Sequence, residues 1–327
     1  MAKRRILICG ATGFIGRNIA ETFAGNPDYD VVGVYNKRPP FVCTGLDWIK
    51  ADLTNPADVE RAIRGVDTIV QAAATTSGSK DIVTRPYIHV TDNAVMNSLL
   101  FRAAHDHGVK HVVFFSCTVM YPSSEKALSE DDFDAHRGIH PRYFGVGWTK
   151  VYVEKLCEFY AGLGRTRYTA IRHSNIYGPH DKFDLERSHV FGATVTKVLS
   201  ATDGKITVWG AGEEARDLLY VGDLVDFVDR AIRKQETPYE LFCCGLGSAT
   251  KVKDLVAKIN RISGRNLRIE HDLSQPSIPT SLHLDCSKAE RVLGWKPATS
   301  LEDGIRRTID WWLANIAPAR AVASGSR

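Results

Sequence analysis

A glycine-rich turn near the N-terminus restricts the possible folds more than any other feature of the sequence. Residues 10–16 read GATGFIG, directly after the apolar run 5–9 and directly before the helix-period segment 17–24. Glycines in such a turn let the backbone approach a pyrophosphate, whose charge then lies on the free N–H groups at the positive end of the helix. The spacing is G-x-x-G-x-x-G and not the general G-x-G-x-x-G, so the prediction of a dinucleotide site depends on the flanking strand and helix. The residues expected at this site are Gly10, Thr12, Gly13, Phe14, Ile15 and Gly16.

Short apolar runs alternate, through the first half of the chain, with segments whose apolar residues recur with the period of an α-helix. Strands are predicted at 5–9, 31–35, 47–51, 68–72, 112–116 and 168–173, and helices at 17–24, 57–63, 92–107, 151–163 and 301–315. This alternation predicts an α/β fold, a doubly wound parallel Rossmann sheet with a smaller C-terminal substrate domain. We expect residues 1–177 and about 217–245 to form the dinucleotide-binding domain. Residues 178–216 and 246–316 would form the smaller domain, and 317–327 a disordered tail.

Composition excludes several classes of function. The net charge is only +4 and basic residues alternate with acidic ones, which argues against nucleic-acid binding. Apolar runs such as 69–74 are far shorter than the roughly 20 residues of a membrane span, and the N-terminal one is too broken for a secretion signal. The seven cysteines lack metal-ligand spacing, which favours free thiols, no bound metal and a cytoplasmic location.

Three residues after the second strand bear on the choice of cofactor. Asn36, Lys37 and Arg38 occupy the place where an NAD site usually offers an acidic residue to the adenosine ribose. Cations there suit a 2′-phosphate, so we expect NADP, with NAD as the alternative if Lys37 and Arg38 form only a solvated turn. Asp52, after the third strand, could accept a hydrogen bond from the adenine amino group or could cap a loop.

Further motifs along nearly the whole chain resemble the extended short-chain dehydrogenase/reductase family, also called the NAD-dependent epimerase/dehydratase family. They are the glycine turn, NIYGP at 175–179, LGWKP at 293–297, and the residues Asp52, Leu53, Ala72, Ala73, Ala74 and Asn93. The resemblance implies cofactor contacts for these six residues. It also implies a contact from His173 to the carboxamide end of the cofactor, although His173 could instead simply pack.

The likeness is greatest to the GDP-L-fucose synthase-like branch of that family. It depends on YGPHDKF at 177–183, SHV at 188–190, VWGAG at 208–212 and RDLLYV at 216–221. It implies a nucleotide diphosphate sugar as substrate, with Arg216 neutralising the diphosphate, and a homodimer formed through helices 92–107 and 151–163. Arg216 as a surface ion pair and His189 as a packed histidine are the alternatives. The residues expected to line the sugar-nucleotide site are Asn175, His189, Val190, Lys197, Val208 and Arg216.

The catalytic pattern of the family is only partly present. Its chemistry uses a Tyr-x-x-x-Lys turn and a nearby Ser or Thr, and Lys150 fits the lysine, but Val146 stands where the tyrosine would be. The hydroxyl position falls on Cys117, next to Thr118. The histidine of the GDP-fucose synthases is retained as His180, whereas their cysteine position falls on Val119.

Three hypotheses follow for an NAD(P)-dependent nucleotide-sugar epimerase, reductase or dehydrogenase. In the first, Tyr143 or Tyr177 reaches in from a loop, or His180 and Cys117 exchange protons with the sugar. In the second, hydride moves slowly while water or Thr118 relays the proton. In the third, the chain is a catalytically impaired homologue that binds cofactor and nucleotide sugar as a sensor or partner subunit. The residues expected to act in catalysis are Lys150, His180, Cys117, Thr118 and Tyr143.

Overall fold

The computed structural model describes residues 3–75, 85–185, 188–274 and 280–318. Its centre is a seven-stranded sheet in the order β10-β6-β5-β4-β1-β2-β3, in which every neighbouring pair is parallel. The order reverses between β1 and β4, as in a doubly wound fold, and this confirms the predicted fold class. The strands are β1 (Arg4–Cys9), β2 (Tyr29–Tyr35), β3 (Leu46–Lys50), β4 (Thr68–Gln71), β5 (His111–Phe115), β6 (Arg167–His173) and β10 (Tyr239–Cys244).

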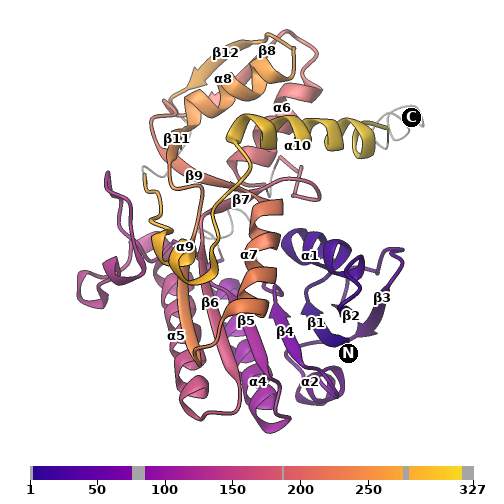
Figure 1. The fold of residues 1–327 in the computed structure, drawn as a ribbon. Coiled ribbons are helices and arrows are strands. Elements are labelled where there is room, and N and C mark those ends of the chain that lie inside the picture. The colour runs from indigo at the N-terminus through magenta and orange to yellow at the C-terminus, as the bar shows by residue number, and fades with distance from the viewer. Residues whose placement is uncertain (1–2, 76–84, 186–187, 275–279, 319–327) are drawn as a thin grey trace.

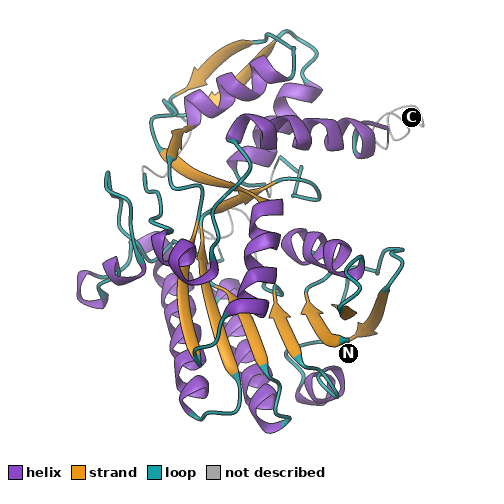
Figure 2. Cartoon of the chain, in the orientation of Figure 1, coloured by secondary structure: helices purple, strands orange, loops and turns teal. Residues whose placement is uncertain are grey.

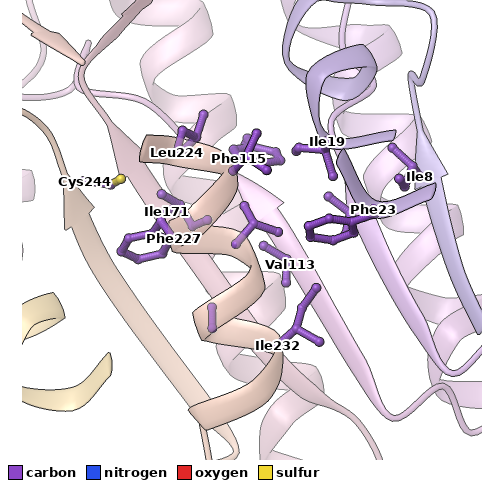
Figure 3. Packing of buried hydrophobic residues seen from close by; sticks show 14 of the residues in the cluster. Ile8, Ile19, Phe23, Val113, Phe115, Ile171, Leu224, Phe227, Ile232 and Cys244 are labelled. Atoms are coloured by element: carbon purple, nitrogen blue, oxygen red, sulfur yellow. The ribbon is translucent and has the colours of Figure 1, made fainter. Parts of the chain in front are cut away.

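Helices cover both faces of this sheet (Figure 1). On one face lie α1 (Phe14–Ala24), α7 (Val221–Lys234) and α9 (Ser287–Leu293), and on the other α2 (Pro56–Ala62), α4 (Thr91–Asp106) and α5 (Phe144–Gly162). Ile6 and Ile8 of β1 belong to the first core and Leu7 to the second, because successive strand residues point to opposite faces. Figure 3 shows side chains of α1, α7, β5 and β6 gathered into the first core.

A smaller part of the chain lies beyond the C-terminal ends of the central strands (Figure 2). Its core gathers apolar side chains from three helices, among them Phe191, Leu255 and Trp312. Its elements are β7 (Asn175–Tyr177), β9 (Ala215–Tyr220) and β11 (Ala249–Lys251) in one sheet, the parallel pair β8 (Lys205–Trp209) and β12 (Arg268–Asp272), and helices α6 (Val190–Ser200), α8 (Val252–Ile262) and α10 (Leu301–Asn315). Short 3₁₀ turns complete the fold at Pro86–His89, Glu130–Asp132, Ala135–Arg137 and Pro141–Tyr143.

One predicted helix boundary is wrong by seven residues. The helix predicted at 151–163 begins at Phe144, so Lys150 lies in its second turn and not ahead of it. Residues 144–150 read FGVGWTK, and two glycines with aromatic and branched residues make a poor helix by propensity. Packing overrides that propensity: a β-carbon at Gly145 would meet Val90 at 2.9 Å, and one at Gly147 would meet Ile139 at 2.9 Å.

Two other expectations concern the ends and surface of the chain. Residues 319–327 of the predicted tail lie outside the described residues, while Ala317 packs against the core of the smaller part. Among the described residues, none of the helices has the length and apolar character needed to cross a membrane.

Candidate functional site

The glycine turn packs so tightly that two of its glycines leave no room for a side chain. Gly10 has φ +72°, and a β-carbon there would lie 2.7 Å from the Cα atom of Ala73. A β-carbon on Gly16 would collide with the carbonyl oxygen of Gly10. Gly13 donates its N–H to that same oxygen at 2.8 Å and forms the N-cap of α1, where no described side chain caps the helix. The first amides of α1, from Phe14 onward, are therefore available to an anion.

The residues predicted to hold the adenosine end lie beside this turn. Arg38 Nη1 donates to the carbonyl oxygen of Thr12 at 2.7 Å, which holds an exposed guanidinium against the turn. Asp52 Oδ1 accepts from the Thr54 hydroxyl at 2.7 Å and from the Thr54 N–H at 2.9 Å. These hydrogen bonds from Thr54, with a smaller contribution from Asn36, lower the pKa of Asp52. Asp52 thus caps a loop and remains charged beside the turn.

The end of β4 closes the other side of the turn. The N–H of Ala72 donates to the carbonyl oxygen of Cys9 at 3.2 Å. Asn93 is buried in α4 and exchanges two hydrogen bonds with the backbone of Thr75, at 2.9 and 3.1 Å, while its Nδ2 also donates to the His89 carbonyl oxygen. These backbone groups occupy the amide of Asn93, which holds the backbone at Thr75 against α4.

Lys150 and Cys117 meet at the C-terminal end of β5. Together with Tyr143 they are called the Lys150 group below. Lys150 Nζ donates to the carbonyl oxygen of Phe115 at 2.7 Å and lies 4.9 Å from the ring centroid of Phe114. Burial lowers the pKa of Lys150, while Cys117 and Glu154 raise it. Burial also raises the pKa of the Cys117 thiol, and the charge of Lys150 lowers it. At neutral pH the thiol is therefore a proton donor beside a lysine.

Tyr143 joins this group from the start of α5. It is the N-cap residue of the helix and is partly buried. Burial raises the pKa of Tyr143, whereas the charge of Arg216 lowers it and that of Cys117 raises it. The phenol therefore lies within electrostatic range of Cys117 and of Arg216, which comes from β9 of the smaller part.

Among the hydroxyl groups near Cys117, only one is available. Ser116 is buried and donates to Glu154 Oε1 at 2.5 Å. Within the described residues, the Thr118 hydroxyl has no hydrogen-bond partner, although its carbonyl oxygen accepts from the Tyr121 N–H. Val146, in the first turn of α5, carries no proton donor.

The structure places two other predicted groups elsewhere. His180, at φ +66°, bonds through Nε2 to Glu21 Oε2 at 3.0 Å, and its ring centroid lies 4.8 Å from that of Trp311. It thus lies between α1 and α10. Tyr177 is buried in the core of the smaller part with its hydroxyl against Gly304, so it does not reach in from a loop as one hypothesis required.

His173 is the last residue of β6 and lies within electrostatic range of Lys150. Its Nδ1 donates to the Ser174 carbonyl oxygen at 2.7 Å, and its ring packs edge-on to Phe115. Burial, together with the charges of Lys150 and His189, lowers the pKa of His173 to about 4 despite the opposing effect of the hydrogen bond to Ser174. The ring is therefore neutral, and the N-terminus of α6, which follows His189, is close to this group.

The predicted sugar-nucleotide residues line the smaller part. Asn175 Nδ2 donates to the Asp217 carbonyl oxygen at 3.2 Å, and Arg216 Nη1 donates to the carbonyl oxygens of Ala215, at 2.9 Å, and Thr280. Lys197 Nζ donates to the Thr207 carbonyl oxygen at 3.0 Å. The other members of the set are His189, exposed ahead of α6, Val190, the first residue of α6, and Val208, buried in β8. Arg216 is the second residue of strand β9.

A buried ion pair behind Cys117 and Lys150 was missed by sequence reasoning. Arg172 Nη2 bonds to Glu154 Oε2 at 2.7 Å, and both side chains are 4% exposed. The available signal was Arg172 inside the apolar segment of β6, together with several charged residues on α5, one of which had to be its partner. Charged residues are rarely buried unless paired, so Glu154 and Arg172 could have been matched to each other.

Known proteins resemble this chain along nearly its whole length. GDP-L-fucose synthase of Sinorhizobium fredii is 26% identical over 319 residues, covering 96% of this chain and 97% of that protein. GDP-L-colitose synthase of Yersinia pseudotuberculosis is 25% identical over 317 residues, covering 94% of this chain and 98% of that protein. A crystal structure of UDP-glucose 4-epimerase with UDP-glucose, from Thermotoga maritima, superposes with a TM-score of 0.84 at 25% identity, covering 95% of this chain and 99% of that one.

These relatives confirm the resemblance predicted from the motifs. Residues 6–245 match the sequence model of one family, and the matched region includes the glycine turn, the Lys150 group and Arg216. The chain belongs to the NAD dependent epimerase/dehydratase family.

Proposed function

We propose that the protein is an NADP-dependent epimerase, reductase or dehydrogenase of a nucleotide diphosphate sugar, with GDP-sugars as the preferred class. The observation that carries the proposal is the convergence of Cys117, Lys150 and Tyr143 with Arg216, because it joins proton donors to an anion-binding cation. GDP-sugars are preferred because enzymes named for GDP-L-fucose and GDP-L-colitose are among the relatives.

The glycine turn suits a dinucleotide because the first amides of α1 are open, and only glycines at positions 10 and 16 allow the turn to pack this closely on its own backbone and on Ala73. The turn would hold the pyrophosphate, and Arg38 with Lys37 would hold a 2′-phosphate, which favours NADP over NAD. When bound, the nicotinamide supplies or accepts a hydride at a sugar carbon.

The side chains of this chain would then manage the proton. Burial raises the pKa of both Cys117 and Tyr143, so each holds its proton at neutral pH. Proton donors suit reduction of a keto group, in which the new hydroxyl oxygen must receive a proton. Lys150 keeps a positive charge next to that oxygen, and Thr118 adds a free hydroxyl. Arg216 would bind the diphosphate, whose oxygens replace the backbone carbonyls it now contacts.

We also propose that two copies pair through α4 and α5. Four large apolar side chains on these helices are at least 40% exposed, namely Val95, Phe144, Tyr152 and Phe159. Aromatic side chains on a solvent face are typical of subunit interfaces. Light scattering on Phe159→Glu should give a monomer if this face pairs, and a native protein that is itself monomeric would contradict the proposal. The seven free cysteines suit the reducing cytoplasm.

The test is to incubate the protein and NADPH with GDP-, UDP-, CDP- and dTDP-sugars, including 4-keto forms. The reduced-nicotinamide absorbance and the sugar NMR spectrum are followed together. Turnover with one base is expected, and Tyr143→Phe should lower kcat about 10²- to 10⁴-fold. Tyr152→Phe, on the exposed side of the same helix, is the control and should keep its activity.

Val146 is the observation that favours the other candidate, a catalytically impaired homologue that only binds. That candidate predicts tight binding of cofactor and nucleotide sugar with no change in either over hours. The same experiment therefore separates the two.

A further inference from the structure

A network of buried polar side chains lies directly behind the Lys150 group. Arg172 of β6 faces Glu154 of α5 with two donors: Nη2 bonds to Oε2 at 2.7 Å and Nε to Oε1 at 3.0 Å. This two-point geometry fixes the orientation of both side chains, as a single lysine could not.

The pair also binds the connection between β5 and α5. Ser116 donates to Glu154 Oε1 at 2.5 Å. The remaining Arg172 nitrogen, Nη1, donates to the Tyr121 hydroxyl at 2.7 Å and to the Glu130 carbonyl oxygen at 2.9 Å. One ion pair thus joins a strand end, a helix and the connection between them.

Each member of the network is placed next to a residue of the proposed site. Ser116 precedes Cys117, Arg172 precedes His173, and Glu154 lies one helical turn after Lys150. A movement of the pair would therefore move all three site residues.

We propose that Glu154 and Arg172 are positioning residues, which fix Cys117, Lys150 and His173 relative to one another so that proton transfer can occur. This inference rests on the proposed function for its catalytic consequence, but its structural part can be measured without any substrate.

Stability alone does not explain the pair. Removing two charges from water costs so much that apolar residues of similar volume often replace a buried ion pair without loss of stability. Removing only one partner is damaging, because the other charge is left buried. A double replacement therefore separates positioning from stability.

The electrostatics of the site agree with this role. Burial raises the pKa of Cys117, and of the groups around that thiol Lys150 and Arg172 lower it while Glu154 raises it, with an effect larger than that of Arg172. Loss of both charges should therefore move ionisation of the Cys117 thiol to lower pH.

The test compares Glu154→Met/Arg172→Met with Val59→Ala, a control that removes buried volume from α2 outside the site. Iodoacetamide alkylation of Cys117 is followed against pH by peptide mass spectrometry, with Cys117→Ser identifying the peptide. We expect the double variant to fold and its alkylation midpoint to move to lower pH. We also expect kcat to fall at least tenfold with little change in KM for NADPH, because the glycine turn is unaltered.

An alkylation profile and kcat equal to those of Val59→Ala would overturn the proposal, leaving the pair a purely structural feature. If the double variant does not fold, Arg172→Lys decides, since it keeps the charge but loses the two-point geometry. It should lower kcat at least tenfold at unchanged KM, and a native kcat would overturn the proposal. If no substrate turns over, the alkylation profile still tests the positioning of Cys117, so failure of the proposed function is recognised separately.

Discussion

Replacing Arg38 with alanine should reduce the preference for NADPH over NADH. The guanidinium is held against the glycine turn by its 2.7 Å hydrogen bond to the Thr12 carbonyl oxygen. Arg38 comes shortly after the C-terminal end of β2, where the adenosine ribose lies in folds of this class. A 2′-phosphate would find Arg38 already oriented, whereas NADH offers only an uncharged 2′-hydroxyl there.

The size of the effect follows from the exposure of the arginine. A hydrogen bond to a charged group contributes about 1.5–3 kcal/mol, and solvent reduces this to about 1–2 kcal/mol at an exposed side chain such as Arg38. Since 1.4 kcal/mol corresponds to a factor of ten, Arg38→Ala should weaken NADPH binding about 5- to 30-fold. Binding of NADH should change less than about twofold, because the lost contact involves only the 2′-phosphate.

Calorimetric titration of both cofactors measures these affinities directly. The loss for NADPH should shrink when salt is raised, because exposed charges are screened. Arg61→Ala is the matched control, since Arg61 is also exposed and also donates to a backbone carbonyl, that of Lys50 at 2.8 Å. Equal losses for NADPH and NADH, or a native protein that prefers NADH, would refute the reasoning.

Three further predictions concern single positions. Gly304→Ala should lower the free energy of unfolding by about 1–3 kcal/mol in a denaturant titration, because its β-carbon overlaps the Tyr177 hydroxyl and ring; adding Tyr177→Phe should restore part of the loss, since the two ring carbons at 2.8 and 2.9 Å remain. Burial raises the pKa of Asp181 to about 7, so its protonated form stabilises the fold at low pH, and this stability is lost as pH rises from about 4 through 7. Asp181→Asn should remove the pH dependence of the thermal midpoint over that range, and an unchanged pH profile would contradict this. Lys150→Met should leave stability equal or higher in the same denaturant titration, since burial disfavours the charge, while turnover falls at least about 100-fold; turnover within twofold of native would exclude Lys150 from the chemistry.

Local sequence patterns predicted the parts of the fold that depend on neighbouring residues. The turn at Gly10 to Gly16 and the flanking strand and helix appear where the pattern placed them, and α10 begins and ends at the predicted residues. Such elements depend on backbone conformation and on hydrophobic period, which a single segment carries.

Contacts between distant segments were beyond the sequence. The first turn of α5 has weak helical propensity and forms because Gly145 and Gly147 pack against Val90 and Ile139. Likewise the partners of His180 on α1 and α10 depend on how the two parts of the chain meet, and no spacing along the chain gives that arrangement.

The position of the phenol on α5 bears on which group passes the proton. Successive residues of an α-helix rise about 1.5 Å and rotate about 100°, so positions 146 and 143 both lie within about 40° of Lys150, on the same face. Tyr143 is the N-cap residue, with φ −104° and ψ 4° outside the helical region, and it stands directly before the first residue of the helix. A phenol at 143 instead of 146 is therefore anchored about 4.5 Å farther from the lysine along the axis.

Cys117 is the group that can bridge this added separation. Its thiol responds to the charge of Lys150, and the ionisation of Tyr143 responds to Cys117. Val146 has no proton to give. Transfer between the Tyr143 phenol and the substrate oxygen beside Lys150 therefore needs a second donor, which the Cys117 thiol would provide. Cys117→Ser keeps a donor and should retain more turnover than Cys117→Ala in the NADPH assay. Full turnover in Cys117→Ala would show that the phenol works without the thiol.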